Sequence, residues 1–123
     1  MKTIVLFFAS LSLLAFASGC TASYGHTDID KVASGETGGT VSSRMITIPI
    51  GTVVTAHIAP FNTDGHPMEG SVEVDDGTIL QVDPTADDKH YAFQGTKLGK
   101  TNVSLTADGL VIAVIQAEVV PQP

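Results

Sequence analysis

The residues of this chain that could do chemistry are one cysteine, four histidines and several neighbouring aspartates. The histidines stand on separate segments, at His26, His57, His66 and His90. None has the HxH or HExxH spacing that would bring two imidazoles to one metal ion, so we expect solvated histidines. No serine stands in a GxSxG nucleophile elbow, and no glycine-rich phosphate loop leads into a helix pattern. We therefore predict a protein that is not an enzyme and holds no cofactor.

The aspartates offer one alternative, a calcium site. Carboxylate oxygens suit calcium because it is a hard cation. Turns that gather at one end of a fold could bring such carboxylates together, although no DxDxDG loop is present. Aspartates of this kind more often form turns and add solubilising charge, so calcium or small-solute binding is the alternative function. The candidate ligands are Asp75, Asp76, Asp87 and Asp88, with Asp83 nearby.

The cysteine, Cys20, follows a segment that looks like a secretion signal. A single lysine, Lys2, precedes an apolar run at residues 4–16. This run is short for a bilayer-spanning helix and has the length of a signal-peptide apolar region. A lone thiol in an oxidising compartment invites pairing between chains, whereas acylation would consume it. The alternatives are a secreted chain cleaved nearby with a free thiol, and an uncleaved helical anchor.

The sequence Ala17-Ser18-Gly19-Cys20 resembles the lipobox of bacterial lipoproteins. The resemblance implies that residues 1–19 are removed and that Cys20 becomes a diacylglycerol-modified, palmitate-bearing N-terminus. The chain departs from the family at Ala17, where leucine is usual. Thr21 replaces the aspartate that holds enteric lipoproteins at the inner membrane, so the resemblance implies the outer membrane.

The net charge excludes several partners. Six lysines and arginines against thirteen aspartates and glutamates give a formal charge of −7. Such a chain repels nucleic acid and does not adsorb to anionic headgroups by electrostatics alone. Membrane attachment must then be covalent or hydrophobic.

Residues 20–43 are rich in Gly, Ser, Thr and Asp and show no sustained periodicity. We predict a flexible tether here, which would hold the domain on the order of 25 Å from the lipid. A first edge strand within residues 40–43 is the alternative. The folded domain is expected over residues 44–123.

Strand patterns fill that domain. In residues 101–108, Val103 and Leu105 share one parity and Ser104 and Thr106 the other, as in a half-buried strand. We expect residues 91–109 to form a hairpin around Gly95 and Gly99. The long strand at 110–120 should place Val111, Ala113, Ile115, Ala117 and Val119 on one face. About seven short strands with regular turns predict an all-β, immunoglobulin-like antiparallel β-sandwich.

Several segments support this prediction through a resemblance to bacterial immunoglobulin-like (Big) domains of the intimin and invasin type. They are Ile48–Thr55, Asp64–Val72, Ile79–Asp83 and Gly95–Thr106. The chain departs from the family at Glu73, where many members have a core tryptophan. The resemblance implies a structural or adhesive module without catalytic residues.

We therefore expect a lipid-anchored envelope protein that binds another protein or a surface polysaccharide. The candidate contact is the loop at residues 60–70, with Asp64-Gly65 as a turn signal. A strand at 45–50, expected at a sheet edge because of Pro49, could instead accept a partner strand. Within the loop the apolar side chains either lie exposed or fold back onto the sandwich. The candidate residues are Phe61, Asp64, His66 and Met68.

Overall fold

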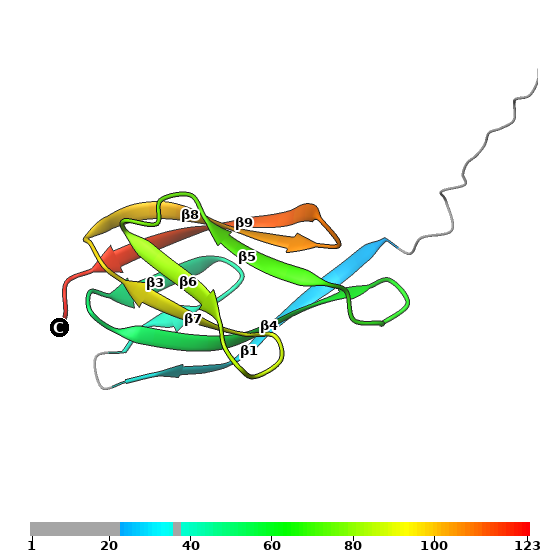
Figure 1. Ribbon diagram of the computed structural model, residues 1–123, viewed down its shortest axis with the longest axis horizontal. Coiled ribbons are helices and arrows are strands. Elements are labelled where there is room, and N and C mark those ends of the chain that lie inside the picture. The colour runs from blue at the N-terminus through cyan, green and yellow to red at the C-terminus, as the bar shows by residue number, and fades with distance from the viewer. Residues whose placement is uncertain (1–22, 36–37) are drawn as a thin grey trace, which may run out of the picture.

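The computed structural model describes residues 23–35 and 38–123, which form two β-sheets packed face to face with no helix (Figure 1). The described strands are β1 (Tyr24–Ser34), β2 (Thr40–Val41), β3 (Met45–Pro49), β4 (Val53–Asn62), β5 (Gly70–Val74), β6 (Leu80–Pro84), β7 (His90–Gly95), β8 (Gly99–Ala107) and β9 (Leu110–Val120). The all-β sandwich expected from the sequence is confirmed.

The strand order is that of an immunoglobulin fold. One sheet has the order β1-β4-β7-β6 and the other β2-β3-β9-β8-β5. These correspond to immunoglobulin strands A, B, E and D facing G, F and C, with β2 and β3 added beside G. The sheets are antiparallel except that β3 runs parallel to β9. The additions raise the described strands to nine, above the seven or so expected.

The core lies between the two sheets and follows the alternation of the strands. Val103 and Leu105 of β8 are buried, as their parity predicts. Each apolar side chain of this size contributes about 1.5–3 kcal/mol on burial. The largest side chains in the centre are Phe93, Ile46, Ile48, Leu80, Val54 and Val103.

The tether prediction for residues 20–43 is wrong over much of its length. β1 occupies residues 24–34 and pairs with β4, and β2 occupies residues 40–41, so the sandwich begins well before residue 44. β1 carries little apolar signal because it is an edge strand held by backbone hydrogen bonds, with Ile29 its one side chain packed against the core. The edge strand considered at 40–43 is present as β2, and its Val41 is buried.

The hairpin expected at residues 91–109 is also wrong. β7 and β8 belong to different sheets, so the connection at residues 96–98 crosses the sandwich. The true hairpin is β8–β9, which turns at Asp108 and Gly109. Both turn residues have positive φ, 50° and 86°, and Asp-Gly is a favoured pair for such turns.

One extra residue in β9 changes which side chains face the core at the start of this strand. Leu105 pairs with Ala113 and Thr106 with Val111, which leaves Ile112 as an extra residue in a β-bulge. Because side chains alternate every residue, the insertion moves Val111 to the solvent while Ile112 packs against the core. The prediction holds for Ile115, Ala117 and Val119, which are buried.

The strand at residues 45–49 is not an edge. β2 pairs with Ile46 and Thr47 on one side of β3, and β9 pairs on the other. Among the described residues, the edge strands are β2 and β5 in one sheet and β1 and β6 in the other.

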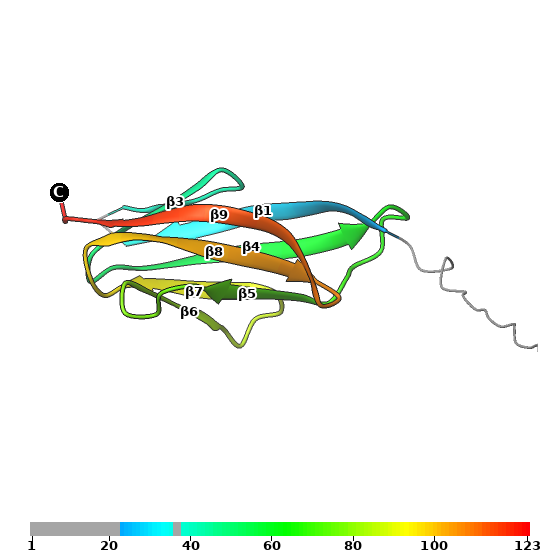
Figure 2. The ribbon, with the colours of Figure 1, turned by 90° about the horizontal axis from the view of Figure 1, so that it is seen from above.

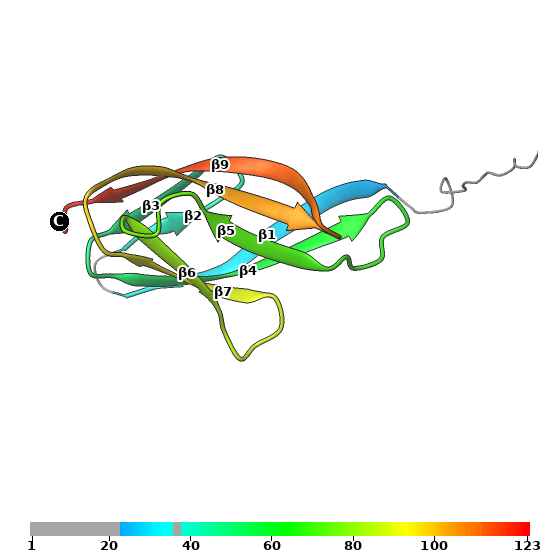
Figure 3. The same ribbon diagram turned by 45° about the horizontal axis from the view of Figure 1, so that its top comes forward.

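The start of β1, the β4–β5 loop and the β8–β9 turn lie together at one end of the sandwich, on the right of Figures 2 and 3. The C-terminus lies at the opposite end. We call the first group the N-terminal end and define it as residues 23–24, 63–69 and 108–111.

Candidate functional site

Backbone hydrogen bonds join the three segments of the N-terminal end. The amide of Thr63 donates to the carbonyl of Ser23 at 2.9 Å. The amide of Asp108 donates to the carbonyl of Glu69 at 2.7 Å. The amide of Glu69 donates in return to Oδ1 of Asp108 at 2.9 Å. The loop predicted as a contact surface is therefore fixed to the first strand and to the β8–β9 turn.

The tip of this loop is organised by Asn62. Its Oδ1 accepts hydrogen bonds from the amides of Asp64 and His66, both at 2.9 Å. The backbone amide of Asn62 donates to the carbonyl of His66 at 2.9 Å. Gly65, within the turn, has a φ of 84°. The side chains of Asp64 and His66 stay exposed. We did not single out Asn62 in the sequence, although an asparagine ahead of Asp-Gly is a known turn former.

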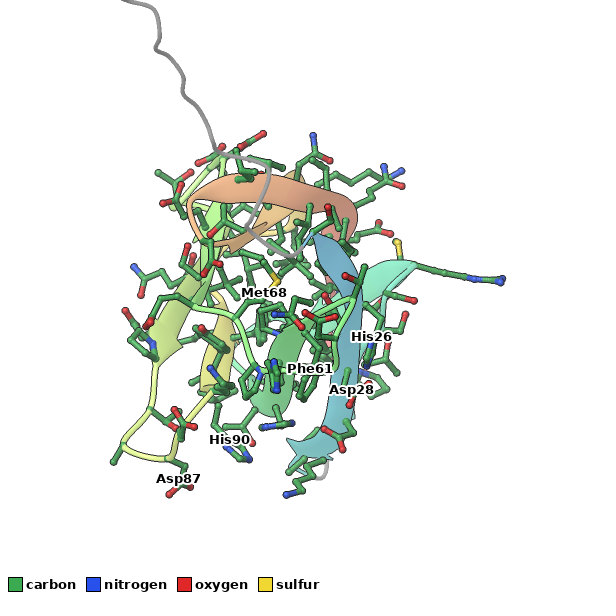
Figure 4. The ribbon with its side chains drawn as sticks, turned by 90° about the vertical axis from the view of Figure 1, so that its right-hand side faces the viewer. His26, Asp28, Phe61, Met68, Asp87 and His90 are labelled. Carbon is green, nitrogen blue, oxygen red and sulfur yellow. The ribbon has the colours of Figure 1, made fainter. Side chains whose placement is uncertain are left out.

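The apolar candidates of the loop lie closer to the fold. β4 continues through Asn62, so Phe61 is part of a strand and is half-buried. Its ring stacks on the imidazole of His26 in β1, with centroids 5.1 Å apart and planes 12° from parallel. Met68 is only 8% exposed, although it lies outside the central core cluster, and its carbonyl accepts a hydrogen bond from Nζ of Lys89 at 3.3 Å. Figure 4 looks onto this end and shows Phe61 and Met68 among the side chains there.

His57 in β4 contacts residues of both neighbouring strands, β1 and β7. Nδ1 of His57 in β4 lies 2.7 Å from Oδ1 of Asp30 in β1. The ring of His57 also lies 5.1 Å from that of His90 in β7, at a tilt of 52°. These contacts span the strand order β1-β4-β7. Sequence reasoning missed the pair because Asp30 fell within the predicted tether.

The aspartates considered for calcium do not gather at one end. Asp75 and Asp76 lie in the β5–β6 turn, whereas Asp87 and Asp88 lie in the β6–β7 turn, so β6 separates the pairs. Asp83 lies within β6 itself. No group of three or more histidine, cysteine, aspartate or glutamate side chains within the described residues is close enough to hold a metal ion. The described carboxylates therefore do not form the cluster that the alternative calcium function would use.

Asp76 acts as a turn former. Its Oδ1 accepts hydrogen bonds from the hydroxyl of Thr78 at 2.6 Å and from the amide of Thr78 at 2.9 Å. These bonds favour the ionised form and lower the pKa of the Asp76 carboxyl from its usual value, and Lys97 adds a smaller effect in the same direction. The carboxylate is thus used by its own turn.

Tyr91 bridges the two sheets near the N-terminal end. Its hydroxyl donates to the carbonyl of Gly70 at 3.3 Å. Burial raises the pKa of the phenol, and Asp88 and Glu69 raise it further through their negative charge. The cavity beside it has a volume of about 10 Å³, room for one water molecule at most. This space does not accommodate an organic ligand.

The N-terminal end also exposes apolar side chains. Leu110 is 72% exposed and Val111 is 62% exposed. Tyr24, the first residue of β1, is 36% exposed. Sequence reasoning assigned Val111 to the core because the bulge at Ile112 has no sequence signature of its own. Cys20, the predicted lipidation site, lies outside the described residues. Within the described residues, no helix is long and apolar enough to cross a membrane.

No protein-family model and no curated protein matches the chain in sequence. Among solved structures it is similar to domains of the S-layer protein SbsC. For domains 4 and 5, domains 5–6 and domains 4–9 the TM-scores are 0.51, 0.52 and 0.55, at 16%, 14% and 13% identity. The matches cover 77%, 77% and 80% of this chain and 54%, 45% and 15% of those chains. At this identity the similarity supports the β-sandwich fold, and the chain spans about half or less of each structure.

Proposed function

We propose that this chain is a non-catalytic lipoprotein of the bacterial cell envelope, anchored by an acylated Cys20 and carrying one immunoglobulin-like domain related to the intimin and invasin type. The domain contacts a second envelope protein or a surface polymer, in an adhesive or accessory assembly role. Thr21 after the acylated residue favours the outer membrane, by the lipobox analogy.

One observation carries the proposal. The lipobox-like sequence ending at Cys20 stands directly before a folded immunoglobulin-like domain whose first strand begins at Tyr24. Lipidation places a protein at a membrane, and a sandwich of this strand order is a structural module that needs no catalytic centre. The protein SbsC, whose domains share the fold, is a surface-layer protein by its name, which agrees with an envelope role.

The β4–β5 loop is the first place to look for the contact with a protein or polymer. Asp64 and His66 are exposed on a backbone fixed by Asn62, so binding would lose little conformational entropy. Phe61 contributes through its partly exposed ring beside His26. Met68 contributes only indirectly, because it is buried beneath the loop.

The anchor is tested by growing bacteria that express the full chain with radiolabelled palmitate. The wild-type chain should take up label and fractionate with membranes, and Cys20→Ser should do neither. Cys20→Ser is informative because Cys20 precedes the described residues and is the one cysteine of the chain. An unlabelled wild-type chain in the soluble fraction would refute lipid anchoring.

The contact is tested by a photoreactive residue at position 66 in cells, with one at exposed Leu98 as control. We expect one dominant envelope adduct, or a polysaccharide adduct, from position 66 only. Equal adducts from both positions would show that the loop is not the contact surface.

A further inference from the structure

Resting on the proposed acylation of Cys20, we infer that the part of the N-terminal end formed by the start of β1 and the β8–β9 turn lies against the lipid bilayer, with Leu110 and Val111 in the headgroup region. The β4–β5 loop at the same end keeps its exposed tip, with Asp64 and His66, for the proposed contact. The domain then stands on the membrane on this end, rather than hanging from a long tether. The surface involved is a bilayer-contact surface formed by the start of β1 and the β8–β9 turn.

The first step is the reach of the chain. Thr21, Ala22 and Ser23 are the only residues between Cys20 and the first residue of β1. A fully extended chain spans at most about 3.6 Å per residue, so Tyr24 lies within roughly 15 Å of Cys20. Acyl chains buried in the hydrocarbon hold Cys20 itself at the headgroups. The start of β1 cannot move far from the bilayer surface.

The second step is the rigidity of this end. The carbonyl of Ser23 already accepts a hydrogen bond from Thr63, and Glu69 and Asp108 are bonded to each other twice. Holding the start of β1 near the membrane therefore holds the β4–β5 loop and the β8–β9 turn near it as well. The views in Figures 1 and 2 place all three segments at the same end.

The third step is the chemistry of the surface. Leu110 and Val111 are the two most exposed large apolar side chains described, at 72% and 62%. They directly follow the turn that faces outward at this end. Tyr24 is also partly exposed here, and tyrosine favours the interface between water and lipid. Contact with lipid would remove this apolar surface from water.

Charge explains why the anchor is needed. The carboxylates of Asp64, Glu69 and Asp108 are exposed at the same end. They disfavour anionic headgroups, so this surface should not draw the unlipidated domain to an acidic membrane. An anchor a few residues away makes the contact intramolecular, and the resulting high effective concentration allows a weak contact to form. The expected occupant is therefore zwitterionic lipid beneath an anchored domain.

The chain offers a matched control at its other end. Leu98 precedes β8 and is 51% exposed, whereas Leu110 follows the turn after β8. The nine residues of β8 separate the two leucines, a distance of about 30 Å at the usual rise of a strand. A leucine of similar exposure thus lies far from the anchor.

The experiment uses the mature acylated chain, purified from bacterial membranes and reconstituted in phosphatidylcholine vesicles. Leu110→Cys and Leu98→Cys each add one free thiol, because acylation blocks Cys20. An environment-sensitive fluorophore is attached to that thiol, and spin-labelled phosphatidylcholine is added as quencher. We expect the Leu110→Cys probe to emit at shorter wavelength and to lose most of its emission, and the Leu98→Cys probe to show neither change.

Three results would overturn the inference while leaving the anchor intact, as judged by palmitate uptake and flotation with vesicles. They are two unquenched probes, two equally quenched probes, and a blue-shifted but unquenched Leu110→Cys probe. The last result would mean that protein, such as a second copy, covers Leu110. A chain that neither takes up palmitate nor floats would refute the proposed function and this inference together.

Discussion

Nδ1 of His57 lies 2.7 Å from Oδ1 of Asp30, which joins the second strand of the first sheet to an edge strand that sequence reasoning had taken for a tether. The contact is one of few side-chain bonds that hold β1, since most of its side chains are exposed. It therefore reports directly on whether β1 is folded.

We expect Asp30→Ala to lower the free energy of unfolding by about 0.5–1.5 kcal/mol, the net value of a typical hydrogen bond. The matched control is Asp28→Ala, because Oδ1 of Asp28 lies 3.6 Å from Nε2 of His26, whose side chain is more exposed than that of His57. Such a surface pair contributes close to nothing. Urea unfolding of both variants measures the difference, and equal losses would contradict this account.

Removal of residues 1–43 should destabilise the domain by more than about 2 kcal/mol, because it deletes β1 and β2 and uncovers apolar surface packed by Ile29 and Val41. Removal of residues 1–22 alone should leave the stability unchanged. Denaturant unfolding of both truncated chains provides the measurement. A chain starting at Arg44 that was as stable as one starting at Ser23 would restore the tether interpretation.

Met68→Ala should lower the free energy of unfolding by about 1.5–3 kcal/mol, the value of burying a side chain of this size, because Met68 is buried beside the core cluster rather than within it. His66→Ala, two residues away and exposed, should change stability by less than about 0.5 kcal/mol. The melting temperatures of the two variants show which loop residue stabilises the fold and which can be changed without affecting it. A small effect of Met68→Ala would show that burial of this side chain does not stabilise the domain.

Acid should weaken the β5–β6 turn through Asp76. The hydrogen bonds from Thr78 lower the folded-state pKa of this carboxyl, so its contribution is present above the unfolded-state pKa, near pH 4, and is lost as the pH falls through the folded-state pKa. Asp76→Asn should therefore flatten part of the stability loss below about pH 4. Asp75→Asn, next to it, is the control. Parallel pH profiles for wild type and Asp76→Asn would argue against the effect.

The sequence predicts the fold where burial imposes a period. The alternation of Val103 and Leu105 identifies β8, and Asp108-Gly109 identifies the turn after it. The pairing of the strands was harder to predict from the sequence. Residues 96–98 connect strands of two different sheets, but they are as short as the loop of a hairpin. β1 was missed because an edge strand with one packed apolar residue shows no alternation.

The candidate site was predicted in part. Asp-Gly indicated an exposed turn at Asp64, which the structure places at the loop tip. The backbone of Met68 is hydrogen-bonded to the carbonyl of Pro60 and to Nζ of Lys89, two contacts that the sequence pattern does not reveal. The exposure of Val111 depends on the extra residue Ile112, which only the pairing of β8 with β9 reveals.

The bulge at Ile112 divides β9 into two regions that tolerate substitution differently. Inward-facing positions from Ala113 onward are constrained by the core, whereas Leu110 and Val111 before the bulge contact little of it. Substitutions at Leu110 and Val111 should therefore alter the proposed bilayer contact at little cost in folding stability. The proposed contact can therefore diverge in evolution at this end of the domain while the core residues of the sandwich stay the same.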